Sequence, residues 1–405
     1  MNPGKKLDCG DAEDGFGVNQ GDISRSFHTP HYHSALLGHL KETEPELWAW
    51  FRETLDPDQA AVEQAELELL RTTYRLDGEV HGVLCGFAPL VAGRLGLSDE
   101  VVLYQDLGAG ERNARVMRLA GRIHVVFSGD FLDLLDSREQ EAALAHELAH
   151  VSLHDRSDGD YQILDHLVHR AEEEEVGSDV LGETARRLRL HTEVFADRVA
   201  REVVGDRRPV ISTIVKVQTG LRNVDPEAYL RQARQIIESD PSSSHGWTHP
   251  ELHIRVACLA AEGTEVLDDV VTELIDGPDD LDRIDLLGQL RLQEITARSL
   301  RSASSLEALI DDDFRSYLKN YVGFEVMSHD PISDQELAPM SPSVRHLVAA
   351  ILADVALVGD GHGMARMVAV SREADRQGIG AEFDKVISRA TEQTLAEVRT
   401  LRRDS

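Results

Sequence analysis

The chain has few cysteines and no long hydrophobic segment. Its 405 residues include three cysteines, Cys9, Cys85 and Cys258, which lie far apart. An odd number of distant cysteines excludes a disulfide framework and is typical of a reducing compartment. No apolar run reaches the roughly 20 residues that a membrane-spanning helix needs, and no apolar segment of a signal peptide follows Lys5 and Lys6. We therefore expect a cytoplasmic protein without a membrane span.

Basic residues are also scarce relative to acidic ones. The chain has 42 lysines and arginines against 73 aspartates and glutamates, which gives a formal net charge of −31. Such a chain repels the phosphates of nucleic acids and anionic membrane surfaces, so neither is an expected partner. The hydrophobic content of 41% is that of a globular protein.

Apolar periodicity and turn residues predict an α+β protein that is mostly α-helical. Strands are predicted at Val101–Asp106, Val116–Leu119 and Ile123–Phe127, with the last two joined at Ala120-Gly121. The polar stretch from Gly159 to Gly182 is predicted to connect two helices. Helices are predicted over residues 45–55, 57–75, 80–95, 181–204, 226–238, 265–275, 283–300, 342–358 and 381–402.

We predict four parts along the chain. Residues 1–27 are rich in Gly, Asp and Asn and predict a disordered tail. Residues 28–75 form N-terminal helices, residues 76–262 form the domain that carries the motifs described below, and residues 263–405 form a C-terminal helical domain. An apolar helix ending near Asp360 faintly resembles TerB-like helical domains, and a helical packing or partner-binding domain is the simpler interpretation.

Residues 146–150 read His-Glu-Leu-Ala-His, the HExxH pattern. On a helix, His146 and His150 leave the same face and can reach one zinc ion, while Glu147 can act as a general base toward water. Ser137 and Gln140 predict a capping box that begins this helix. The pentapeptide therefore predicts two metal ligands and a proton acceptor within about one helical turn.

A catalytic zinc site needs a third protein ligand. Leu153 and Arg156 stand where the extended pattern HExxHxxGxxH requires Gly and His, so that class is excluded. His154 lies two helical turns from His146, about 12 Å along the axis, which is too far to share an ion.

A second helix offers a carboxylate instead. Glu193 and Asp197 are four residues apart on one face, so Glu193 can bind the metal while Asp197 accepts a hydrogen bond from a ligating histidine. His191 is a rival for the third position. Alternatively, Glu193 and Asp197 pair with Arg186, Arg187 or Arg201 on a solvated helix face.

These motifs together resemble the HtpX-like and CAAX-prenyl-protease-like zinc metallopeptidases. The resemblance consists of HExxH, the ExxAD sequence Glu193–Asp197, the segment Thr248-His249-Pro250 followed by Arg255, and Asn113-Ala114 before a strand. It covers roughly residues 70–260, and Arg115 replaces the aromatic residue that usually follows Asn-Ala in the family. Many members of the family are embedded in membranes or secreted, unlike the expectation for this chain.

The resemblance implies a zincin-like fold and peptide hydrolysis with one zinc ion per chain. Zinc held by His146, His150 and Glu193 would polarise a water and the scissile carbonyl, and Glu147 would transfer the proton. The edge strand at Asn113 and Ala114 would hold an extended protein or peptide substrate. The resemblance also places His249 and Arg255 near the metal as oxyanion stabilisers, or His249 as a removable fourth ligand.

Two functions from different classes remain open on these grounds. The first is a soluble zinc endopeptidase, possible in a latent form that movement of the His249 segment activates. The second is a non-catalytic zinc protein, permanently capped by His249, that presents the C-terminal helices to a regulatory protein partner. Glu147 favours the enzyme, because a purely structural zinc site has no use for a general base.

Overall fold

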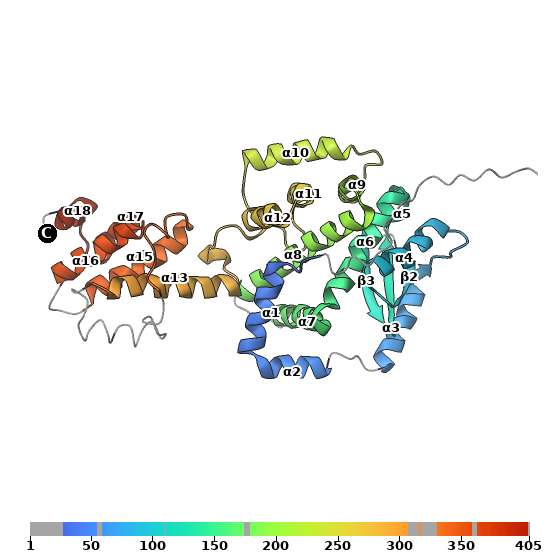
Figure 1. The fold of residues 1–405 in the computed structure, drawn as a ribbon, viewed down its shortest axis with the longest axis horizontal. Coiled ribbons are helices and arrows are strands. Elements are labelled where there is room, and N and C mark those ends of the chain that lie inside the picture. Colours follow the sequence, from blue (N-terminus) through green and yellow to red (C-terminus); the bar gives the residue numbers. More distant parts are fainter. Residues whose placement is uncertain are drawn as a thin grey trace, which may run out of the picture.

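The computed structural model describes residues 27–54, 59–108, 110–173, 179–306, 316, 330–358 and 363–403. It has an α+β fold, mostly helical, with one small mixed sheet, as the sequence predicts. Figure 1 shows a larger body that holds the sheet and a separate bundle of C-terminal helices. The predicted tail lies outside the described residues apart from Phe27. Among the described helices, none combines the length and the apolar character needed to cross a membrane.

The sheet has four strands in the order β1-β2-β4-β3. They are β1 (Thr73–Arg75), β2 (Glu100–Asp106), β3 (Asn113–Leu119) and β4 (Arg122–Ser128). β2 and β4 are parallel, and β3 and β4 form an antiparallel hairpin. Ala120 and Gly121 both have positive φ angles, 50° and 69°, which a two-residue hairpin turn requires. The three predicted strands are confirmed, and β3 lies at an edge of the sheet.

The N-terminal helices are α1 (His31–Thr43), α2 (Pro45–Thr54) and α3 (Gln59–Thr72). The predicted helix over 57–75 was wrong at its end, because Thr73–Arg75 pair with β2 instead. α3 covers one face of the sheet through Leu69, while α4 (Gly82–Arg94) packs on the other face. α1 and α2 pack on the helices that follow the sheet.

The helix that carries HExxH is α6 (Ser137–His154), which follows the short helix α5 (Phe131–Leu134). The predicted capping box was wrong by one residue. Asp136 is the N-cap, its carboxylate accepts hydrogen bonds from the backbone of Arg138 and Glu139, and Glu139 accepts one from the backbone of Asp136. The sequence allows a capping box from either Ser137 and Gln140 or Asp136 and Glu139. The pair Asp136 and Glu139 forms it, because Lys216 and Ser212 also bind Glu139.

Five helices of the body follow α6: α7 (Asp160–Glu173), α8 (Asp179–Val204), α9 (Arg207–Thr219), α10 (Pro226–Ser239) and α11 (Leu252–Ala260). The stretch from Gly159 to Gly182 was predicted as a connection, but most of its described part is α7. This helix is amphipathic, and its apolar side packs on α1 and α8. The largest core cluster joins the inner face of the sheet to α4, α6, α8 and α9.

The chain continues with α12 (Thr264–Val271) and a π-helical turn at Thr272–Asp276, which pack on α8 and α11, and then with a short 3-10 turn at Leu281–Arg283. The helices that follow are α13 (Leu286–Ser304), α15 (Pro342–Leu357), α16 (Gly363–Arg376), α17 (Gly380–Ala390) and α18 (Leu395–Arg403). The single helix predicted over 381–402 is two helices, since the chain turns at Glu392, which has a φ of 56°. The core of this bundle is separate from that of the body, and the domain boundary near residue 262 stays a prediction.

Candidate metal centre

His146 and His150 on α6 and Glu193 on α8 form a compact group that can bind a metal ion. One ligand atom from each residue lies within 4.8 Å of the other two. His146 Nε2 is 3.4 Å from Glu193 Oε2, and His150 Nε2 is 3.8 Å from Glu193 Oε1. We call these three residues the metal cluster. It exists because α6 and α8 pack closely along the core, which turns the predicted ligand faces toward each other.

Asp197 lies behind His146, as the sequence predicts for a residue that orients a ligand. His146 Nδ1 is 3.0 Å from Asp197 Oδ1, which leaves Nε2 directed at Glu193. Asp197 also accepts two hydrogen bonds from Arg255, from Nε at 2.8 Å and from Nη2 at 2.7 Å. Such paired bonds fix the carboxylate in one orientation. Arg255 therefore contacts Asp197 directly, and its Nη2 is 3.6 Å from Glu193 Oε2.

The electrostatics of the cluster favour an ionised Glu193. Burial alone would raise the pKa of Glu193, but His146 and Arg255 hold it well below its usual range. Burial would likewise lower the pKa of His146, yet its hydrogen bond to Asp197 and the negative charge of Glu193 beside it raise the pKa to about 10. Burial lowers the pKa of His150 to about 4, which keeps its imidazole neutral. Glu193 is thus an anionic ligand and His150 a neutral one, whereas His146 must lose a proton before it can bind a cation.

A cation fits the cluster on one further observation. Glu193 Oε2 is buried and makes no hydrogen bond, although a buried carboxylate oxygen without a partner is costly. His146 Nε2, His249 Nε2 and Arg255 Nη2 lie 3.4, 3.5 and 3.6 Å away from it. A metal ion bound by Glu193, His146 and His150 would supply the missing partner. Imidazole with carboxylate is a donor set that suits zinc.

Glu147 follows His146 on α6 and is only 9% exposed. Burial raises the pKa of its carboxyl group to about 7, and the nearby Glu193 raises it while His146 and Arg255 lower it. A carboxyl group with a pKa near neutrality can both accept and release a proton at physiological pH.

His249 lies at the mouth of the cluster on a loop formed by residues 241–249, which we call the His249 loop. Its Nε2 is 3.5 Å from Glu193 Oε2, and its side chain is 52% exposed. Its Nδ1 is 2.9 Å from Thr248 Oγ1. The sequence-predicted residues His249 and Arg255 are therefore both brought to the cluster, one on the solvent side and one on the buried side.

Asn113 and Ala114 begin the edge strand β3. The Asn113 side chain is exposed, and its Oδ1 accepts a hydrogen bond from the backbone of Ala114 at 2.9 Å. Within the described sheet, β3 pairs only with β4, so its other edge presents unpaired backbone groups. β3 itself lies next to the HExxH helix in the fold, since α6 packs against it.

The alternative ligands and partners lie elsewhere. His191 Nε2 binds Asp276 Oδ1 at 2.8 Å and its ring stacks on Tyr32. His154 lies 3.9 Å from Asp165. Arg186 and Arg187 both bind Glu183, and Arg201 binds the backbone of Leu259 and Ala261. The alternative of a solvated face is wrong, because Glu193 and Asp197 are 8% and 1% exposed.

The sequence did not predict which residues hold the His249 loop in place. Arg186 on α8 donates hydrogen bonds to the carbonyls of Ser244 and Gly246, at 3.3 and 3.0 Å. Arg283 donates to the carbonyl of Ser244 at 3.2 Å. These partners are 39 to 60 residues apart in sequence, and no local pattern of residues signals such contacts.

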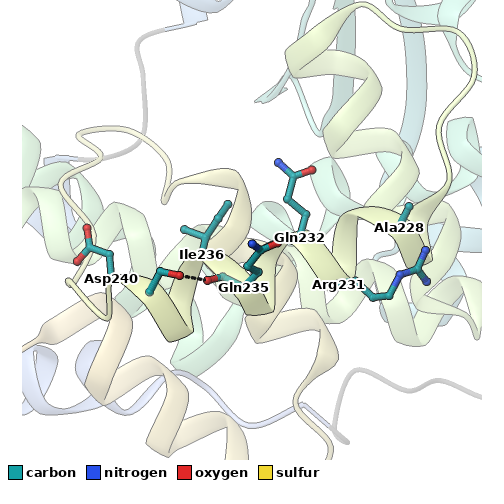
Figure 2. Close-up of a pocket in the computed structure, with 7 residues that line it drawn as sticks. Ala228, Arg231, Gln232, Gln235, Ile236 and Asp240 are labelled. Atoms are coloured by element: carbon teal, nitrogen blue, oxygen red, sulfur yellow. Dashed lines mark hydrogen bonds between the residues drawn. The ribbon is translucent and has the colours of Figure 1, made fainter.

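Outside the cluster, an open hollow of about 720 Å³ lies along α10 (Figure 2). It is lined by Ala228, Arg231, Gln232, Gln235, Ile236, Ser239 and Asp240. All of these residues belong to one helix and its C-cap, and none belongs to the metal cluster or to its neighbours. We assign no function to this hollow.

Comparison of the chain with protein-family models, with curated proteins and with solved structures found no match.

Proposed function

We propose that this protein is a zinc-dependent endopeptidase, similar to the HtpX-like and CAAX-prenyl-protease-like metallopeptidases and with a zincin-like catalytic fold. One observation carries the proposal: His146, His150 and Glu193 converge within 4.8 Å, with the buried carboxyl group of Glu147 beside His146 in the chain. A structural zinc site is usually closed by four protein ligands, whereas a catalytic one keeps a position open for water or substrate.

In the proposed mechanism each residue has a separate task. Bound zinc supplies Lewis-acid polarisation and makes water more acidic. Glu147 accepts a proton from the attacking water and passes it to the leaving amine. Asp197 keeps His146 in the orientation that ligation needs, and Arg255 keeps Asp197 charged and fixed.

The substrate we propose is an extended segment of a protein or peptide. The free edge of β3, beginning at Asn113 and Ala114, offers backbone hydrogen-bonding groups next to α6. Addition of a strand to such an edge fixes a substrate through its main chain, largely independently of its side chains. This mode of binding suits an endopeptidase, because it needs no free terminus.

His249 supports a second candidate, a latent form of the same site. Its Nε2 lies 3.5 Å from the Glu193 oxygen that lacks a hydrogen bond, within reach of a metal ion at the cluster. In this candidate His249 occupies the open position until the His249 loop moves. If the loop never moves, the protein is a capped zinc protein that acts only through its partners.

The test combines metal analysis with a peptide-library digest read by mass spectrometry. We expect about one zinc per chain and cleavage at internal peptide bonds. Glu147→Gln should lower the rate by about 10²–10⁴-fold while zinc is retained. Glu141→Gln is a matched control, since Glu141 is on the same helix and pairs with Arg138.

Full activity of Glu147→Gln would exclude the proposed mechanism. His249→Ala separates the remaining roles. Faster cleavage by His249→Ala than by the wild type supports the latent form, and slower cleavage supports stabilisation of the oxyanion by His249. If the wild type and His249→Ala both bind zinc and neither cleaves a peptide, the capped, non-catalytic candidate is supported.

A further inference from the structure

The His249 loop is held at its base by hydrogen bonds to two different parts of the chain. The amide of Ser244, which is fully buried, donates to the carbonyl of Leu274 in the π-helical turn at 2.7 Å. Arg186 on α8 and Arg283 after that turn both donate to the Ser244 carbonyl. The loop is therefore fixed both to the helix that carries Glu193 and to the segment that leads into the bundle.

The loop also has a tight turn that depends on this anchoring. A Cβ on Gly246 would lie 2.0 Å from the carbonyl oxygen of His249, so the chain folds back on itself between these residues. Arg186 donates to the Gly246 carbonyl at 3.0 Å. The position of His249 thus follows from where Ser244 and Gly246 are held.

One carboxylate organises these arginines. Glu183, which is 7% exposed, accepts two hydrogen bonds from Arg186 at 2.7 Å each and one from Arg187 at 3.0 Å. Arg187 in turn is 3.3 Å from Asp285 and donates to the carbonyl of Arg283 at 3.4 Å. We call Glu183, Arg186, Arg187 and Arg283 the arginine clamp.

The clamp meets the start of α13. Asp285 is the N-cap of this helix, is fully buried and accepts hydrogen bonds from Gly288 and from the Tyr32 hydroxyl. α13 runs from the clamp into the bundle, where Leu300 and Ala303 belong to the core (Figure 1). At 1.5 Å per residue it is about 28 Å long. A displacement of the bundle therefore reaches the clamp through one continuous helix.

We propose that the arginine clamp couples the position of α13 to the His249 loop, so that the C-terminal bundle controls the access of His249 to the metal cluster. Arg186 and Arg283 are positioning residues in this device, since they touch the loop backbone and neither ligand nor substrate. The catalytic consequence rests on the proposed zinc peptidase function, whereas the coupling itself does not.

Amide hydrogen exchange of the full-length protein, measured with and without zinc, tests the coupling. Arg283→Ala should speed exchange at the amides of Ser244, His245 and Gly246 by about tenfold, the factor that one or two hydrogen bonds contribute. Arg122→Ala is the matched control, because Arg122 forms an ion pair with Glu100 on the sheet and belongs to neither the loop nor the clamp. Exchange in that variant should equal that of the wild type.

A second variant tests whether the signal passes through α13. A Cβ on Gly288 would lie 2.8 Å from Asp285 Oδ1 and 2.9 Å from Ile284 Cγ1, so Gly288→Ala disturbs the start of α13, and the three atoms nearest to that Cβ all lie outside the loop. We expect faster exchange at the same loop amides. Changes confined to α13, or unchanged loop exchange in Arg283→Ala, would overturn the proposal.

The catalytic arm compares cleavage rates of single and double variants. Arg283→Ala should change the rate in the same direction as His249→Ala, and adding it to His249→Ala should cause no further change. Additive effects would show that the clamp does not act through His249. If no peptide is cleaved, the proposed function fails, and the exchange measurements still decide whether the coupling exists.

Discussion

The body of the protein and its C-terminal bundle both bury charged side chains, but they satisfy them differently. In the bundle, Glu373 accepts hydrogen bonds from Gln377 and Arg376, and Ser299 donates to Gln377. Around the metal cluster, four polar side chains converge on Glu193, yet its Oε2 makes no hydrogen bond. The network around Gln377 is satisfied by its own side chains, whereas Glu193 Oε2 has no hydrogen-bond partner at a place where a cation can bind.

The two regions therefore use their buried polar groups for different purposes. A closed network such as that of Gln377 stabilises one packing arrangement and has no spare bonding capacity. A buried group without a partner, such as Glu193 Oε2, lowers the stability of the metal-free protein, and binding of a cation would restore that stability. We therefore expect the two regions to respond differently to metal and to substitution.

The largest expected effect is that of zinc on local stability. At a free zinc concentration about 1,000 times Kd, binding adds about 4 kcal/mol to the stability of the metal-bound region. Amide exchange in α6 and α8 should slow by up to about a thousandfold, while exchange in α15 and α16 should stay unchanged. Glu193→Ala should abolish the effect. Equal slowing in α15 would mean that body and bundle unfold as one unit.

Asp197→Asn should weaken zinc binding by about 10- to 100-fold, the usual effect of removing the partner of a ligating histidine. The variant keeps the shape of the side chain but loses the charge that faces His146 and Arg255. Titration against a chelator measures the change. Asp384→Asn is the control, since Asp384 is a buried carboxylate of the bundle. Unchanged affinity in Asp197→Asn would remove Asp197 from the site.

The sequence predicted the metal cluster well because its signals are local. His146 and His150 share a helical face, as do Glu193 and Asp197, and a helix converts that spacing into geometry. The pairing of α6 with α8 was predicted from the need for a third ligand and from the resemblance to a family, since no spacing within one helix shows which helix it packs on. The strands β2, β3 and β4 were likewise predicted from their own residues.

The features that the sequence did not reveal depend on distant partners. β1 exists because Thr73–Arg75 pair with β2, and Asp136 prevails over Ser137 as the N-cap because Lys216 binds Glu139. The contact of Arg255 with Asp197 spans 58 residues. Each of these contacts is set by tertiary packing, which a single sequence does not show directly.

Gln377→Leu should destabilise the bundle by about 1.5 kcal/mol, because Ser299 and Glu373 lose a buried hydrogen-bond partner. Gln377 is fully buried, so the substitution also changes no exposed surface. Urea unfolding, monitored by amide hydrogen exchange in α16, measures the loss of stability. Zinc affinity should not change, and a fall in affinity would contradict the separation of the two regions.

The smallest effect is expected from the helix caps, which both regions share. Asp136 caps α6 and Ser341 caps α15, and replacing either with Ala should cost about 1 kcal/mol. Each variant should speed amide exchange at the start of its own helix and leave the other helix unchanged.

The effect of Asp136→Ala on zinc affinity shows whether the metal ligands depend on local contacts or on the stability of the whole of α6. The start of α6 is about 14 Å along the helix from His146, and Glu139 remains bound to Lys216 and Ser212 after the cap is lost. Asp136→Ala should therefore change zinc affinity by less than about threefold, since a lost cap frays only the first turn. A loss of zinc affinity as large as that of Asp197→Asn would mean that the ligands depend on the stability of the whole helix. The contrast between the cluster and the bundle would then reflect helix stability instead of local polar contacts.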